Sequence, residues 1–140
     1  MRLLSFIFLL LFLTGCYTYI QAPGAVGRVV DADTGKPVRD ARITRPPLIP
    51  GQSVGGKELF VPFGGVPATT ISSDKSGRFN LAPATHTQIR FMYLRNPKGA
   101  IYPSSFLISA EGYATNELHG IATSHTLWRV DLGKVLLKKP

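Results

Sequence analysis

The chain has 140 residues, and its 16 Lys and Arg against 8 Asp and Glu give a formal net charge of +8. This length suits a single domain with one hydrophobic core. The only cysteine is Cys16, which excludes an internal disulfide framework, so the core must be stable without one.

The first predicted element is an apolar segment at the N-terminus. Met1 and Arg2 precede a run over residues 3–13 that is apolar except for Ser5. As a helix this run would be about 16 Å long, whereas the hydrocarbon core of a bilayer is about 30 Å thick. A cationic start, a short apolar run and then small residues are typical of a secretory signal, which we place at residues 1–15.

An unpaired cysteine is unusual in an exported protein, and Cys16 follows this segment directly. The stretch Leu13-Thr14-Gly15-Cys16 resembles the bacterial lipobox. The resemblance implies that the signal is cut before Cys16, that the thiol receives a diacylglycerol group and that the new amine is acylated. Two competing interpretations are a buried structural cysteine and ordinary signal cleavage that leaves a free thiol.

The lipobox resemblance also predicts a location. Two or more acyl chains give stable membrane anchoring. In enterobacterial lipoproteins an Asp directly after the cysteine favours the inner membrane, and here that position is Tyr17. The resemblance therefore implies the periplasmic face of the outer membrane if the host is Gram-negative, and otherwise a lipid anchor in the cell membrane. Removal of residues 1–15, which include one Arg, would leave 125 residues with a charge of +7.

Residues 16–24 come next and show no periodicity, so we expect a lipid-anchored tether there. Two segments rich in β-branched residues follow, 26–31 and 38–44, and the stretch DADTGKP between them is dense in turn formers. This pattern predicts a hairpin, or a corner between neighbouring strands.

Later segments also alternate in the manner of strands. The stretch DKSG at residues 74–77 predicts a tight turn, after which Phe79 and Leu81 point toward the core. Residues 88–94 alternate as well, and in residues 125–132 we expect core-facing side chains. Those side chains are Trp128, Val130 and Leu132. Short strands separated by turns, without a sustained helical pattern, predict an all-β sandwich.

Several stretches resemble, in the right order, the carboxypeptidase regulatory-like domain. They are Gly27-x-Val29-x-Asp31, Thr34-Gly35-x-Pro37-Val38, Asp40-Ala41-x-Ile43, Ser73-Asp74-x-x-Gly77-x-Phe79-x-Leu81, Ile108-Ser109-Ala110-x-Gly112-Tyr113 and Asp131-Leu132-Gly133-x-Val135-x-Leu137. The resemblance implies a transthyretin-like (Ig-like), seven-stranded β-sandwich over residues 25–138. Carboxypeptidases that contain this domain carry their catalysis in another domain, so the resemblance favours a binding or assembly module.

Residues 45–67 depart from that family. They contain five Pro and five Gly, which excludes a regular helix, yet they are too apolar for a disordered linker. KELFVPF at residues 57–63 could add a short edge strand or lie across the sandwich. One interpretation is a loop packed on its own domain. The other is an apolar surface for a partner, another envelope protein, and the contact residues would be Leu59, Phe60, Val61 and Phe63.

The sequence predicts no catalytic, cofactor or metal site. His86, His119 and His125 lack the spacing of metal ligands, and no serine has a Gly-x-Ser-x-Gly frame. We therefore expect a non-enzymatic envelope module. The alternative is a small periplasmic hydrolase or ligand-binding protein that uses a cleft under the 45–67 loop, with His86 or His119 as the base.

The positive charge suggests an anionic partner. However, Lys36, Arg39, Arg42 and Arg45 recur every three residues, whereas a strand needs a period of two to line one face. This spacing indicates scattered, solvated charge. The export signal argues against nucleic acid, and it leaves lipid headgroups and other envelope polyanions open.

Overall fold

The computed structural model describes residues 14–49, 53–54, 57–58, 65–91, 102–122, 126 and 128–140. These residues form an all-β fold, as the sequence predicts. Residues 1–13 of the predicted signal helix lie outside them. Within the described ranges, no helix has the length and hydropathy that crossing a bilayer requires.

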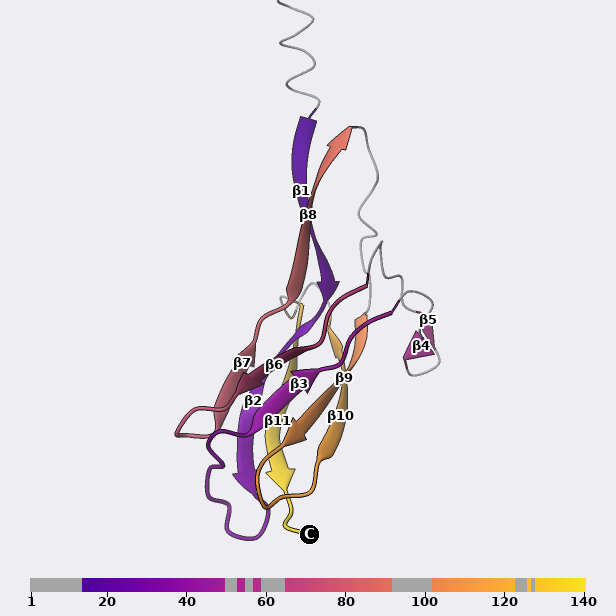
Figure 1. The fold of residues 1–140 in the computed structure, drawn as a ribbon. Helices are drawn as coiled ribbons and strands as arrows, with labels where there is room; N and C mark the ends of the chain where they lie inside the picture. The colour runs from indigo at the N-terminus through magenta and orange to yellow at the C-terminus, as the bar shows by residue number, and fades with distance from the viewer. Residues whose placement is uncertain are drawn as a thin grey trace, which may run out of the picture.

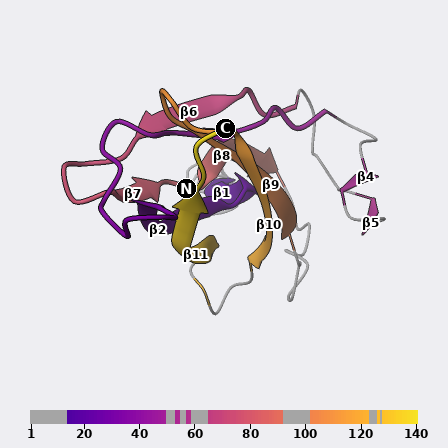
Figure 2. The same cartoon turned by 90° about the horizontal axis from the view of Figure 1, so that it is seen from below.

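Seven strands form two sheets that pack face to face (Figures 1 and 2). One sheet has the order β10 (Asn116–Ala122), β9 (Tyr102–Ser109), β3 (Arg42–Arg45) and β6 (Thr69–Ser72). The other has the order β11 (Arg129–Leu137), β2 (Gly24–Asp31) and β7 (Arg78–Leu81), with β11 parallel to β2. The predicted seven-stranded sandwich is therefore confirmed.

The core lies between the two sheets. Side chains alternate along each strand, so every second residue points inward. Phe79 and Leu81 of β7 are buried as predicted, and so is Val130 of β11. Leu132 packs at the margin of the core. The prediction for Trp128 is only partly met, because this residue precedes β11 in a turn with φ of 59° and is half-buried.

The two predicted turns are present. Asp74 Oδ1 accepts the N–H groups of Ser76 (2.8 Å) and Arg78 (2.9 Å), and Gly77 follows in the left-handed region with φ of 76°. The turn after Asp31 is closed by an antiparallel bridge between Val30 and Pro37, and the chain then passes from one sheet into the other, so the predicted corner is present. The strand predicted at residues 38–44 begins later, at Arg42, because the residues before it cross between the sheets.

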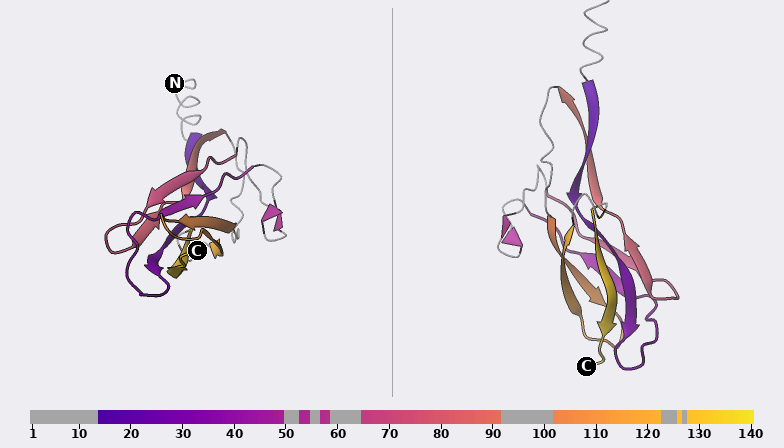
Figure 3. Two further views of the ribbon diagram at one scale, coloured as in Figure 1. Left: turned by 60° about the horizontal axis from the view of Figure 1, so that its bottom comes forward. Right: turned by 180° about the vertical axis from the view of Figure 1, so that it is seen from behind.

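A two-stranded ribbon projects from the sandwich at the end opposite the C-terminus (Figures 1 and 3). It consists of β1 (Thr14–Ala22) and β8 (Ala84–Phe91), which pair antiparallel. The sequence predicted an aperiodic tether at 16–24, whereas most of this segment is strand. The reason is non-local, since β8 supplies the hydrogen-bonding partner. Of the strand predicted at 88–94, residues 88–91 belong to β8 and residues 92–94 lie outside the described ranges.

The 45–67 loop packs on its own domain at both ends. Leu48 and Val66 exchange two backbone hydrogen bonds of 2.9 Å, and both are buried together with Ala22. Between them, β4 (Ser53–Val54) and β5 (Lys57–Glu58) form a small hairpin, so the strand predicted at 57–63 is described only at its start. Leu59, Phe60, Val61 and Phe63 lie outside the described residues, and their contact with a partner stays a prediction.

Candidate functional site

The ribbon joins the sandwich at a pair of prolines. Ala22 pairs with Ala84 and Ala25 pairs with Leu81, so the ribbon prolongs the β2–β7 ladder. Gly24 donates its N–H away from that ladder, to Trp128 O at 2.9 Å. Pro23 and Pro83 lie between these pairs of residues, one on each chain. Neither proline has an N–H, and the ladder is therefore interrupted at the joint.

The side chain of Arg45 crosses from the opposite sheet to this joint. Its Nη1 donates to Pro23 O and to Ala82 O, both at 3.1 Å, and its Nη2 donates to Thr69 Oγ1 at 3.0 Å. Pro23 ends the β1 side of the ribbon, and Ala82 precedes the β8 side. One buried guanidinium thus holds both chains of the ribbon at the point where they leave the sandwich.

Arg45 is a buried cation bound to neutral acceptors. It is 3% exposed, and burial lowers the pKa of its guanidinium, which nevertheless stays charged. In the described part of the chain no carboxylate forms an ion pair with it within 4.0 Å, and its Nε has no hydrogen-bond partner. The sequence placed Arg45 among scattered solvated charges, and this was wrong. Arg45 comes two residues after Ile43 at the end of β3, so its side chain lies on the same inward face as that of Ile43.

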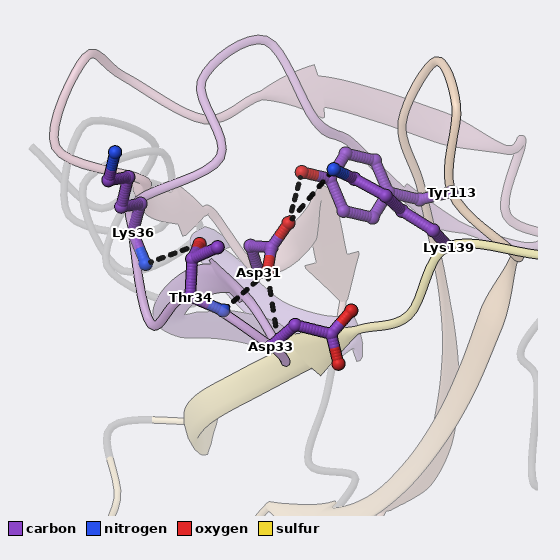
Figure 4. Close-up of polar contacts among 6 residues, drawn as sticks. All are labelled: Asp31, Asp33, Thr34, Lys36, Tyr113 and Lys139. Carbon is purple, nitrogen blue, oxygen red and sulfur yellow. Dashed lines mark hydrogen bonds and ion pairs between the residues drawn. The ribbon is translucent and has the colours of Figure 1, made fainter.

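A second polar cluster lies at the other end of the sandwich (Figure 4). The carboxylate of Asp31, only 6% exposed, accepts the N–H groups of Asp33 (2.9 Å) and Thr34 (2.8 Å) on Oδ1. The hydroxyl of Tyr113 donates to Oδ2 at 2.8 Å, and Lys139 Nζ lies 3.9 Å from the same oxygen. The cluster ties together the β2–β3 corner, the β9–β10 turn and the C-terminal residues.

These hydrogen bonds favour the charged form of Asp31. The backbone N–H of Thr34 and then the Tyr113 hydroxyl lower the pKa of Asp31 from 3.8 to about 2. The same bond raises the pKa of Tyr113, because the donated proton is held by a carboxylate. The N–H groups of Asp33 and Thr34 and the hydroxyl of Tyr113 all donate to this one buried carboxylate. The arrangement therefore stabilises the fold.

Tyr113→Phe is expected to lower the melting temperature by about 5 °C at neutral pH, because it removes a hydrogen bond to a charged group. The Asp31 pKa is depressed in the fold, so its ionised form stabilises the protein above about pH 4 and this stabilisation is lost as the pH falls toward 2. In the variant the folded-state pKa of Asp31 is less depressed, so the acid-dependent loss should be smaller and should be complete at a higher pH. Circular dichroism melts between pH 7 and 2 measure both effects.

Lys139→Gln is the matched control, because Lys139 is exposed and 3.9 Å from the carboxylate. It should change the melting temperature little. An acid profile of Tyr113→Phe that overlays the unaltered chain would contradict the role given to this hydroxyl.

Of the three histidines, the structure describes the side-chain surroundings of His119. His119 lies on β10 with its side chain 67% exposed, 3.8 Å from Glu117. His86 belongs to the ribbon, where its backbone pairs with Tyr19, and His125 lies outside the described residues. Among the described residues no group of three His, Cys, Asp or Glu could hold a metal ion.

Cys16 is the third residue of β1, and its backbone pairs with Ile89. It therefore lies in the half of the ribbon that is remote from the Pro23 joint (Figure 1). The joint and Cys16 thus lie in opposite halves of one two-stranded element.

Comparisons with known proteins name no family. No protein-family model matches the chain, and no curated protein matches it. Among solved structures, the crystal structure of 3-chlorocatechol 1,2-dioxygenase from Rhodococcus opacus 1CP is 16% identical, with 86% of this chain covered and a TM-score of 0.48. The match spans 61% of that enzyme's chain. At this identity and a TM-score below 0.5, the likeness assigns neither a family nor an activity.

Proposed function

We propose that this chain is a lipid-anchored module of the bacterial cell envelope, in which the ribbon is a stalk and the sandwich is a binding or assembly domain. Cys16 carries the lipid in this proposal. In a Gram-negative host the module is anchored at the periplasmic face of the outer membrane, as Tyr17 after the cysteine suggests.

The observation that carries the proposal is the place of Cys16 in β1. Cleavage before Cys16 would remove Thr14 and Gly15 and leave the rest of β1 paired with β8. The acylated residue would then stand at the free end of the ribbon, and the sandwich would lie beyond Pro23. A strand of this length, at about 3.3 Å per residue, holds the sandwich roughly 20 Å from the lipid.

A second part of the proposal is the role of the sandwich as a binding or assembly domain. It is supported by the resemblance to a non-catalytic domain and by the apolar residues Leu59, Phe60, Val61 and Phe63, which we propose as contacts to another envelope protein. Photo-crosslinkers at Phe60 and Phe63 in intact cells test this contact. A chain that stays uncrosslinked at both positions would exclude these residues as the contact.

Cys16→Ala is expected to abolish palmitate incorporation and processing at residue 16. The variant should leave the acylated membrane fraction, either as a soluble chain or as an uncleaved precursor of larger mass. Labelling with radioactive palmitate, followed by membrane fractionation and mass determination, measures this. Thr14→Ala is the matched control, because the lipobox tolerates small residues there, and it should keep the label. A wild-type chain that takes up no palmitate would refute the anchor.

A further inference from the structure

Three exposed cations form one row across the outer face of the three-stranded sheet. Arg28 of β2 pairs with Arg78 of β7 on one side and with Lys134 of β11 on the other. The inward-pointing neighbours Val29, Phe79 and Val135 are buried, and the three cations therefore point outward. With strands about 4.8 Å apart, the row spans roughly 10 Å. In the view from behind in Figure 3, these three strands lie in front.

This row is unfavourable for the isolated fold. Like charges directly opposite each other on neighbouring strands destabilise a sheet. Within the described residues no carboxylate forms an ion pair with Arg28, Arg78 or Lys134. Arg28 is also held in place, because its Nε donates to Ser76 O at 2.9 Å. Ser76 lies two residues before Arg78, the first residue of β7.

The two acidic residues nearest in the chain are occupied by local bonds. Asp74 accepts the Ser76 hydroxyl at 2.7 Å and two backbone N–H groups of its own turn, and the Ser76 bond is the main cause of its lowered pKa. Asp131 accepts the N–H of Gly133 at 2.8 Å, inside the bulge that precedes Lys134. Both carboxylates are thus bonded within their own turns. The charge of Arg78 also lowers the pKa of Asp74, so Asp74 offsets part of the charge at that end of the row, and the row keeps a net positive charge.

We propose that the row formed by Arg28, Arg78 and Lys134 binds a linear, phosphate-bearing polyanion laid across the three strands. Two guanidinium groups suit phosphate, because each can donate a pair of parallel hydrogen bonds, and the ammonium of Lys134 adds a point charge. An extended anionic chain can place its successive charges against all three strands, whereas a single small anion can neutralise only part of the row.

The choice of a polymer over the anchoring membrane rests on the proposed function. Arg28 is twelve residues from Cys16 along β1 and β2, which at about 3.3 Å per residue is roughly 40 Å. Electrostatic attraction fades over a Debye length of about 8 Å at physiological salt. With the anchor at Cys16 and the ribbon upright, the row is out of reach of that membrane's own headgroups.

The test uses the full chain purified in a non-ionic detergent and fluorescently labelled inorganic polyphosphate. Binding is measured by anisotropy at several NaCl concentrations. The triple variant Arg28→Gln/Arg78→Gln/Lys134→Gln should bind at least about tenfold more weakly at low salt, and the slope of log affinity against log salt should fall by about 2. The control variant Arg39→Gln/Arg42→Gln/Lys138→Gln loses the same charge outside the row, and its slope should stay unchanged.

Each other outcome overturns the proposal. Absence of polyphosphate binding at low salt removes the ligand class, and equal losses in the two triple variants show that only net charge matters. A second arm uses phosphatidylcholine vesicles with and without phosphatidylglycerol. If the row binds these vesicles and not polyphosphate, the ligand is a lipid surface. Palmitate labelling of Cys16 is measured in a separate experiment. A failure of polyphosphate binding therefore does not contradict the proposed lipid anchor.

Discussion

Arg45→Ala is expected to lower the free energy of unfolding by about 3 kcal/mol. The substitution leaves the carbonyl oxygens of Pro23 and Ala82 and the hydroxyl of Thr69 without their donor, and Pro23 is fully buried. It also empties the space of a long side chain at the end of the core. Denaturation in a fixed concentration of non-ionic detergent measures the change.

Two further variants separate hydrogen bonding from charge. Arg45→Met keeps the aliphatic stem and removes the cost of burying a charge, so it should be less destabilising than Arg45→Ala. Arg42→Ala, on the same strand but exposed, should change stability by no more than about 0.5 kcal/mol. If Arg45→Ala behaves like Arg42→Ala, the buried guanidinium has no structural role. Hydrogen exchange adds a local readout, since β1 and β8 should exchange faster in Arg45→Ala than β3 and β9.

Gly77→Ala is the second large effect, with an expected loss of about 4 kcal/mol. Gly77 has φ of 76°, which costs any other residue strain, and a methyl group on it would lie 2.3 Å from Val29 O. That oxygen belongs to the backbone of β2, the middle strand of its sheet, and it cannot move aside. Relief of the contact would break the 2.7 Å hydrogen bond from Val29 N to Gly77 O.

Gly35→Ala is the matched control for this prediction. Gly35 has a similar φ of 67°, but nothing lies within 4 Å of the methyl group that Ala would add. The two variants share the backbone strain, about 1 kcal/mol, and differ only in crowding. Equal losses of stability in the two variants would contradict the close approach of the turn to β2.

Features encoded in short stretches were predictable from the sequence. The turns after Asp31 and at residues 74–77 follow from side chains that bond the backbone two to four residues on, and both are present. The side chains of a strand alternate with a fixed period of two. This period placed Phe79 and Leu81 in the core, and both are buried. The count of seven strands was implied by the resemblance to the carboxypeptidase regulatory-like domain and was not read from these patterns.

Features that depend on pairing across the chain were not predictable. The ribbon needs β8, which begins more than sixty residues after β1 ends, and no pattern within residues 16–24 signals that partner. Arg28, Arg78 and Lys134 form a row only through the register of three strands. The burial of Arg45 depends in the same way on carbonyl groups of two distant segments, so its sequence neighbours carry no sign of it.

The continuity of β1 with β2 has a mechanical consequence. A pull on Cys16 would run along one extended chain into β2, which lies in the centre of its sheet between β11 and β7. Such a force loads the hydrogen bonds of both neighbours in shear, many at once, whereas peeling an edge strand would break them singly. If Cys16 carries the proposed anchor, the sandwich is attached through the strand that is hardest to extract, and tension at the anchor is borne by the core and not by a loose end.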